Sequence, residues 1–151
     1  MKNIKFRAWS EDTCEMVQVA RLDIKEETIY YENGIKSLNR EQELGFWWKP
    51  YILMQYTGLK DKNGVHIFEG DILKLDIWQG QEDNYVDSVT HDVVTGRPSK
   101  YIKKLGELKK DTFGGLYVND FYLLNLEIAD NYEIEVIGNI YQNKGLLEEE
   151  E

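Results

Sequence analysis

Hydrophobic and polar residues alternate along most of the chain with a period of two. In residues 4–9, Ile4, Phe6 and Ala8 share one face, while the other face carries two charged residues and a tryptophan. This alternation is typical of a strand with one buried face. The chain is therefore predicted to be mainly β. The same reasoning predicts further strands at 15–24, 28–31, 51–57, 65–68, 72–78, 85–94, 116–118, 121–126 and 132–141.

Short turns that contain glycine join these strands. Asn33 and Gly34 precede a return strand that begins at Ile35, and both residues tolerate the positive φ of a tight hairpin. Turns at 61–64 and 69–71 join three strands within fewer than thirty residues. Such a tightly turned antiparallel meander is typical of a small barrel.

Two segments depart from the alternation. Residues 37–46 permit one short helix, with Ser37 or Asn39 as its N-cap. Residues 100–111 place apolar side chains at helical spacing, although a glycine within the segment disfavours a helix. These apolar residues are Tyr101, Leu105 and Leu108, and the glycine is Gly106.

The length of 151 residues suits a single domain. We expect an N-terminal β-hairpin region over 1–50, a barrel over 51–142 and an acidic tail over 143–151. An irregular basic insertion is expected within the barrel at about 79–115. No internal repeat is visible in the sequence.

Composition and charge exclude several classes of protein. The apolar fraction of 42% is enough for a core, and the net charge of -10 disfavours broad attraction to nucleic acid or anionic membranes. No apolar run is long enough to predict a membrane span. A single cysteine and a charged N-terminal segment predict a cytoplasmic protein.

The sequence contains no arrangement of residues that predicts catalysis. No phosphate-binding glycine loop is present, and His66, His91 and Cys14 are too far apart in sequence for a zinc motif. The oxygen-rich segment from Asp61 to Glu69 has the wrong spacing for a calcium loop and predicts a turn. We therefore predict a non-enzymatic protein without a catalytic residue, metal, cofactor or small-molecule substrate.

An aromatic cluster between residues 46 and 56 is the first candidate partner-binding surface. Aromatic residues fill cores, but they are also enriched at interfaces. Trp47 and Trp48 are adjacent, so both cannot point inward from one strand. One of them is expected to be exposed or covered by another subunit. The candidate partner-binding residues are Trp47, Trp48 and Tyr51.

A basic stretch over residues 97–110 is the second candidate surface. It carries a net charge of +5, whereas the rest of the chain carries -15. Contact with nucleic acid, docking onto an acidic surface, and a simple solvated face all remain open interpretations. Its candidate contact residues are Arg97, Lys100, Lys103, Lys104, Lys109 and Lys110.

Three sequence blocks resemble the YopX-like family of phage and prophage proteins. The blocks are residues 4–9, residues 53–64 continuing to 68–73, and residues 136–141. The resemblance implies a mainly β fold with an SH3-like small barrel, encoded by a phage or an integrated prophage. It implies no activity, cofactor or catalytic residue. Residues 76–115 match no family pattern.

Two classes of function follow. The favoured one is a phage accessory protein that binds a protein partner, or itself as a homo-oligomer, through exposed aromatics and barrel edges. A narrower version is an acidic inhibitor that imitates DNA and binds a host nucleic-acid enzyme. The alternative is a small-barrel nucleic-acid-binding protein that uses residues 97–110.

Overall fold

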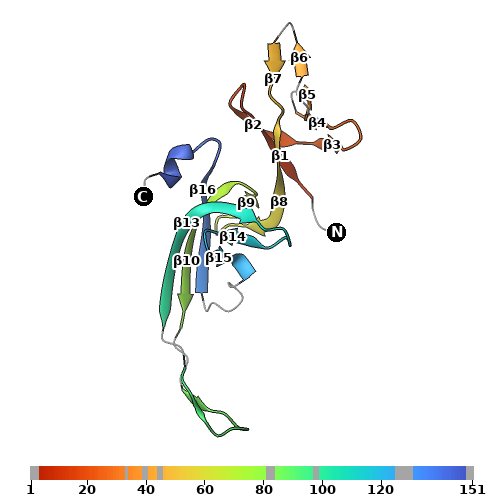
Figure 1. Cartoon of the computed structure of the whole chain (residues 1–151). Helices are drawn as coiled ribbons and strands as arrows, with labels where there is room; N and C mark the ends of the chain where they lie inside the picture. The colour runs from red at the N-terminus through yellow and green to blue at the C-terminus, as the bar shows by residue number, and fades with distance from the viewer. Residues whose placement is uncertain are drawn as a thin grey trace.

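The computed structural model describes residues 4–32, 34–38, 41–43, 46–80, 84–96, 99–124 and 131–148. The fold is mainly β, as predicted (Figure 1). No helix within these ranges is both long and apolar enough to cross a membrane. In chain order the elements are β1 (Phe6–Ser10), β2 (Glu15–Val19), β3 (Arg21–Asp23), β4 (Thr28–Tyr31), β5 (Gly34–Ser37), β6 (Glu41–Glu43), β7 (Phe46–Trp48), β8 (Ile52–Lys60), β9 (His66–Phe68), β10 (Asp71–Gln79), β11 (Tyr85–Val86), β12 (Val93–Val94), β13 (Lys100–Lys110), β14 (Leu116–Val118), β15 (Phe121–Tyr122), β16 (Asn131–Asn139) and the 3-10 helix η2 (Lys144–Leu147).

Two antiparallel sheets form the body of the protein. One has the strand order β2-β1-β8-β9, and the other has the order β15-β14-β13-β10-β16. Smaller sheets are β3-β4-β5, β6-β7 and β11-β12. The hairpin predicted near Gly34 is confirmed, because β4 and β5 pair with Tyr31 opposite Gly34.

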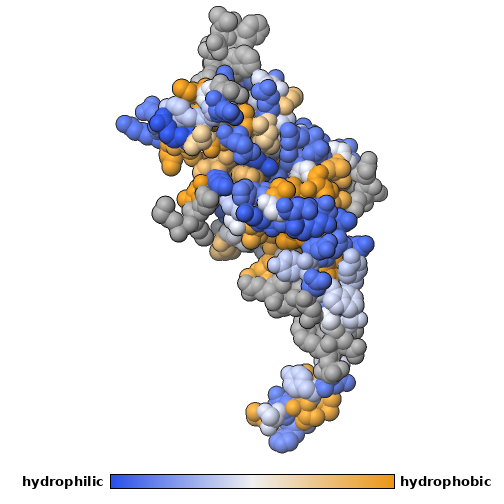
Figure 2. Space-filling view, turned by 180° about the vertical axis from the view of Figure 1, so that it is seen from behind, coloured by the Kyte–Doolittle hydropathy of each residue, from blue (hydrophilic) through white to orange (hydrophobic). Residues whose placement is uncertain are grey.

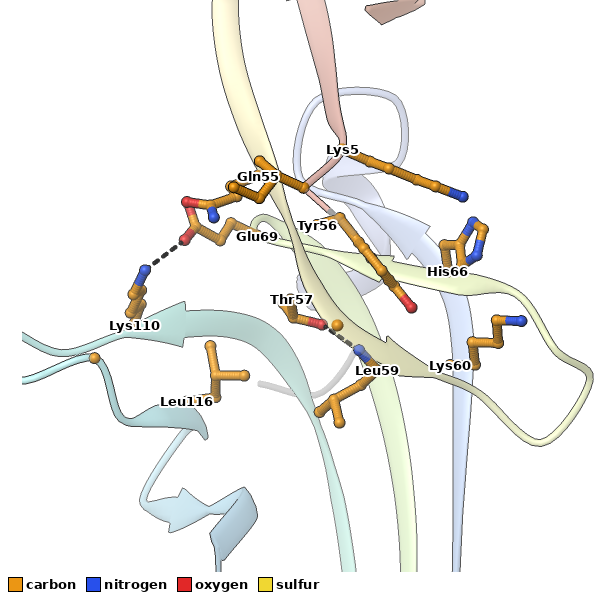
Figure 3. A pocket seen from close by; sticks show the side chains of 13 residues that line it. Lys5, Gln55, Tyr56, Thr57, Leu59, Lys60, His66, Glu69, Lys110 and Leu116 are labelled. Carbon is orange, nitrogen blue, oxygen red and sulfur yellow. Dashed lines mark hydrogen bonds and ion pairs between the residues drawn. The ribbon is translucent and has the colours of Figure 1, made fainter. Parts of the chain in front are cut away.

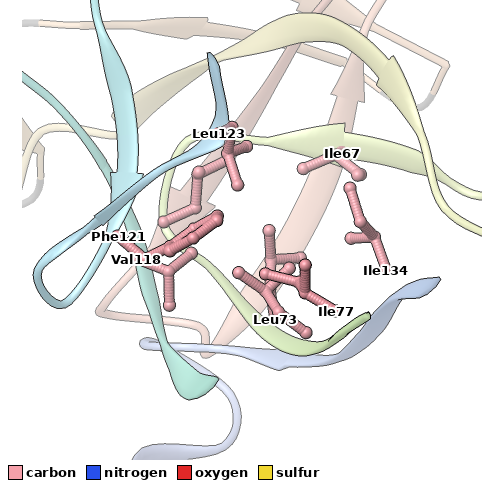
Figure 4. Close-up of a cluster of buried hydrophobic side chains, with 9 residues drawn as sticks. Ile67, Leu73, Ile77, Val118, Phe121, Leu123 and Ile134 are labelled. Atoms are coloured by element: carbon pink, nitrogen blue, oxygen red, sulfur yellow. The ribbon is translucent and has the colours of Figure 1, made fainter. Parts of the chain in front are cut away.

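The five-stranded sheet curls into a half-barrel around an apolar core (Figure 4). Leu73, Leu75 and Ile77 of β10 are fully buried there, because alternate residues of a strand point to one face. Ile67 of β9 reaches the same core from the other sheet. Each such aliphatic side chain stabilises the fold by about 1.5–3 kcal/mol. The other buried core residues are Leu108, Val118, Phe121, Leu123 and Ile134.

The turn between β8 and β9 lies against the edge strand β16. The backbone N–H of Lys62 donates to the carbonyl of Ile134 at 2.9 Å. The N–H of Val136 donates to the Asp61 carboxylate at 3.1 Å. These bonds satisfy edge groups that would otherwise be open to another strand.

The segment predicted as a helix at 100–111 is instead the strand β13, so that prediction is wrong. It pairs with β10 from Lys100 to Glu107. Gly106 is buried in the strand. A larger residue would not fit there, because a Cβ would lie 2.4 Å from the side-chain oxygen of Asn119. The Asn119 side chain donates to the carbonyl of Leu105 at 2.9 Å and occupies that space. The irregular part of the expected insertion is therefore shorter than 79–115.

Two other predictions also need correction. The helix proposed for 37–46 is wrong for the described residues, because β6 and β7 pair there as a hairpin with Glu41 opposite Trp48. The strand expected at 85–94 is a hairpin of two short strands, with Tyr85 opposite Val94. Its turn bends sharply because Asp87 accepts local backbone hydrogen bonds.

The turn before β9 recurs before β14. The Asp61 Oδ1 accepts hydrogen bonds from the N–H groups two and four residues ahead, at 2.8 and 2.9 Å. The Asp111 Oδ1 does the same at 2.9 and 2.7 Å. Gly64 and Gly114 occupy matching positions with φ of +81° and +88°, which favours glycine. The fold thus contains a structural repeat that sequence analysis missed.

Candidate functional site

The aromatic candidates lie on β7 and just beyond it. Trp47 and Trp48 are neighbours on this strand, opposite Gln42 and Glu41 of β6, and their side chains lie outside the described part of the structure. Tyr51 is half-buried, and its ring stacks on Tyr31 of β4 with centroids 6.4 Å apart. Burial and the hydrogen bond with Tyr51 raise the pKa of Tyr31. Tyr51 is therefore partly covered by its own chain.

The structure does not gather the basic candidates on one face. Arg97 lies outside the described residues. Because β13 alternates, Lys103 lies opposite the outward-facing Asp76, whereas Lys104 lies opposite the buried Leu75. The lysines of the stretch are consequently divided between the two faces of the sheet.

Carboxylates neutralise half of the basic candidates. The Nζ atoms of three lysines lie 2.6 to 3.6 Å from carboxylate oxygens, and the hydrogen bond from Lys104 lowers the pKa of Asp120. Lys103 instead lies 5.3 Å from the centroid of the Tyr101 ring. Lys100 makes no ion pair within the described residues. The pairs are Lys104 with Asp120, Lys109 with Glu107 and Lys110 with Glu69.

A hairpin formed by residues 84–96, which we name the arm, extends beyond the ends of β10 and β13 (Figure 1, green). Four of its apolar side chains are between 59% and 83% exposed, and its surface includes an apolar area (Figure 2). None of them belongs to the core. These exposed side chains are Tyr85, Val86, Val89 and Val93.

Local hydrogen bonds give the arm a defined shape. The Asp87 Oδ1 accepts the N–H groups of Val89 and Thr90 at 2.8 and 2.7 Å. These bonds lower the pKa of the Asp87 carboxyl. The Asn84 side chain accepts the N–H of Gly96 at 2.7 Å across the base of the arm. An ordered hairpin with exposed apolar side chains is a plausible contact element for a partner.

The sheet end next to the arm is aromatic and basic. Trp78 and Tyr101 lie opposite each other on β10 and β13, and both are about half exposed. The Tyr101 hydroxyl donates to Asp76 at 2.8 Å, which raises the pKa of Tyr101. Lys100 and Lys103 lie on the same end of β13. This sheet end is thus a second exposed surface with apolar area.

A cleft of about 910 Å³ lies beside β8, and we name it the β8 cleft (Figure 3). Lys5, Tyr56, Lys60 and His66 lie on the same side of the β8 ribbon. The Tyr56 ring meets the His66 imidazole edge-on with centroids 4.7 Å apart, and the Lys5 Nζ lies 6.0 Å from the Tyr56 centroid. The opposite wall carries the ion pair between Lys110 and Glu69.

The other histidine and the cysteine lie in separate parts of the described structure. His91 lies in the turn of the arm with φ of +62°, and Cys14 is exposed with its thiol 3.7 Å from the Glu11 carbonyl. Among the residues that the structure describes, no group of three or more His, Cys, Asp or Glu side chains could hold a metal ion. Asp61 and Gly64 form the turn that the sequence predicted in place of a calcium loop.

Sequence analysis missed the arm and the β8 cleft. The arm had a signal, because two pairs of apolar residues flank a polar turn in a segment without lysine or arginine. The cleft had no such signal, because Lys5 and Lys60 are distant in sequence. Only the pairing of β1, which follows Lys5, with β8 brings the two segments together.

Comparisons with known proteins give a family but no activity. The family described as YopX protein matches residues 5–148. The crystal structure of protein EF1440 from Enterococcus faecalis is similar, with a TM-score of 0.56 and 27% sequence identity. The alignment covers 97% of this chain and 99% of that chain. No curated protein matches the sequence.

Proposed function

Because the chain belongs to the YopX family, we propose that it is a phage or prophage accessory protein that acts without catalysis, by self-association in the bacterial cytoplasm. In this proposal the arm of each copy binds the sheet end of a second copy. We also propose that the half-barrel and the β8–β9 hairpin together form an SH3-like barrel. The bonds from the β8–β9 turn to β16 support that assignment.

The observation that carries the proposal is the exposed apolar arm. A two-stranded hairpin is only marginally stable in water without further packing. The arm nevertheless exposes Val86, Val89 and Val93 to solvent in the single chain. Covering these side chains with a second molecule would remove apolar area from water and stabilise the hairpin.

Charge complementarity favours a second copy of this chain as the partner. The described arm carries Asp87 and Asp92 and no lysine or arginine. At the sheet end, Lys103 lies on the same face as the exposed Trp78, and Lys100 lies at the same end of β13 on the other face. Neither lysine forms an ion pair within the described residues. Reciprocal binding of the arm and the sheet end gives a closed two-fold dimer, which is the commonest symmetric assembly.

The test is the molar mass in solution of a variant with a polar arm. The triple substitution Val86→Thr, Val89→Thr and Val93→Thr keeps side-chain shape and β propensity but removes apolar area. We expect wild type to be a dimer and this variant to be a monomer by size-exclusion chromatography with light scattering.

A matched control is Ile24→Thr, Ile35→Thr and Val65→Thr, three exposed apolar positions away from the arm. This control should remain dimeric. A monomeric wild type, or an arm variant that keeps the wild-type mass, would contradict the proposal.

The DNA-mimic version gains less support from the described surface. That version expects carboxylates aligned along one face, as in a phosphate backbone. On the outer face of the five-stranded sheet, lysines interrupt the carboxylates instead. Lys62 lies 3.4 Å from both Glu133 and Glu135, and Lys74 lies 3.8 Å from Asp76.

A further inference from the structure

Separately from self-association, we propose that the β8 cleft binds the phosphate group of a nucleotide, either free or within a single-stranded oligonucleotide. Lys5 and Lys60 contact the phosphate oxygens, and the aromatic rings of Tyr56 and His66 contact the base. This site differs from the basic stretch at 97–110 that the sequence suggested.

Two of the three lysines that line this cleft, Lys5 and Lys60, have no carboxylate partner within the described residues, whereas Lys110 is paired with Glu69. Lys5 and Lys60 form no ion pair within the described residues, although the chain carries ten more negative than positive charges. By contrast, Lys49, Lys62 and Lys74 each have a carboxylate oxygen within 4.0 Å. Unpaired ammonium groups facing one cleft are available to an anion from solution.

The charged side chains beside His66 on this wall, Lys5 and Lys60, are both cationic. Partial desolvation, Lys5 and Lys60 together lower the pKa of His66. The Tyr56 ring also faces the imidazole. Among the described residues that line the cleft, Glu69 is the only carboxylate, and it is already paired with Lys110. A bound anion would therefore meet the ammonium groups of Lys5 and Lys60 and the imidazole of His66.

The size and the aromatic content of the cleft favour a nucleotide over a bare inorganic ion. A volume of about 910 Å³ is far larger than one phosphate requires and is in the range of ligand pockets. Tyr56 and His66 provide ring surface beside the lysines, and stacking of bases on aromatic side chains is a common mode of single-strand binding. An acidic peptide would make no comparable use of these rings.

The first test is the affinity of the full chain for a fluorescein-labelled twelve-nucleotide oligo(dT), measured by anisotropy at several salt concentrations. We expect Lys5→Gln/Lys60→Gln to weaken binding about tenfold and to reduce the salt slope by about 1.4, since each lost single-strand phosphate contact removes about 0.7. The matched control Lys74→Gln/Lys109→Gln removes the same charge from the outer face and should bind as wild type does.

A second variant pair separates the cleft from the basic stretch. If Lys100→Gln/Lys103→Gln abolishes binding while Lys5→Gln/Lys60→Gln does not, the site is β13 and the proposal is wrong. If a polyglutamate peptide binds as tightly as oligo(dT), the cleft selects negative charge alone and the nucleotide assignment is wrong. Absence of binding by oligo(dT) and by AMP would also overturn it.

The titration of His66 gives an independent readout at the site. The protein has two histidines, so the imidazole signals can be assigned with His66→Gln and His91→Gln. Saturating AMP should raise the pKa of His66 by about one unit, because a nearby phosphate stabilises the imidazolium. An unchanged His66 pKa with bound ligand would place the ligand elsewhere. AMP and oligo(dT) in parallel distinguish a free nucleotide from a nucleic-acid strand.

Discussion

A buried ion pair between Arg7 and Asp71 connects the two sheets at the residue scale. The Arg7 guanidinium lies 2.5 Å from the Asp71 carboxylate and 4.7 Å from the centroid of the Phe68 ring. Asp71 also accepts the N–H of Phe68 at 2.8 Å. Burial raises the pKa of the Asp71 carboxyl, and the bond from Phe68 and the charge of Arg7 oppose that effect.

Removing one partner of this pair should be costly. Arg7→Met leaves the buried Asp71 without its counter-charge, so we expect a loss of about 3–5 kcal/mol in the free energy of unfolding. Arg7→Met/Asp71→Asn removes the unpaired charge and keeps an acceptor for Phe68, so it should be more stable than Arg7→Met. Urea unfolding followed by tryptophan fluorescence measures both. Equal losses in the two variants would contradict this account of the pair.

The Asp61 turn makes stability depend on pH. Desolvation would by itself raise the pKa of Asp61, but N–H donors from Val136, Val65 and Asn63 together lower it. The folded pKa therefore lies below the unfolded value of about 3.9. The resulting stabilisation is complete above about pH 4 and is lost as pH falls through the folded pKa.

Asp61→Asn should cost about 1–3 kcal/mol at pH 7, because its amide cannot satisfy all three N–H donors. The difference from wild type should shrink as pH falls below 4, since wild-type Asp61 then becomes neutral. Urea unfolding at several pH values checks both statements. A difference that stays constant down to pH 2 would mean that the charge of Asp61 contributes nothing.

At the scale of elements, alternation predicted most strands because burial on one face leaves a period of two in the sequence. It failed for β13, where Tyr101, Leu105 and Leu108 happen to have helical spacing. Gly106 was interpreted as a weakness in a helix, whereas its role is to accommodate the side chain of Asn119, which follows β14. That contact is between distant residues, so no local pattern contains it.

The arm should be dispensable for folding. Its exposed valines do not belong to the core cluster, and β10 pairs with β13 from Ile72 to Gln79 without it. Replacing residues 84–96 with a short Gly-Ser linker should change the midpoint of thermal unfolding by no more than a few degrees. The reference is the midpoint of wild type at a concentration low enough for it to be monomeric. A large decrease would show that the arm stabilises the body directly.

At the scale of the whole molecule, the sequence predicted the charge imbalance but not its distribution. The described lysines of the basic stretch lie on both faces of β13, and three of the five are paired with carboxylates. Lys5 and Lys60, which form no ion pair within the described residues, both line the β8 cleft. Such arrangements depend on strand pairing between distant segments. The β8 cleft could therefore be identified only from the three-dimensional fold.

The most direct test of the central claim is hydrogen–deuterium exchange of the wild-type chain at low and high protein concentration. The account predicts that amides in residues 84–96 exchange more slowly as concentration rises, because a second copy covers the arm, while amides of β16 keep constant rates. If exchange in the arm is independent of concentration across the range, the arm does not mediate self-association and the proposed function is wrong.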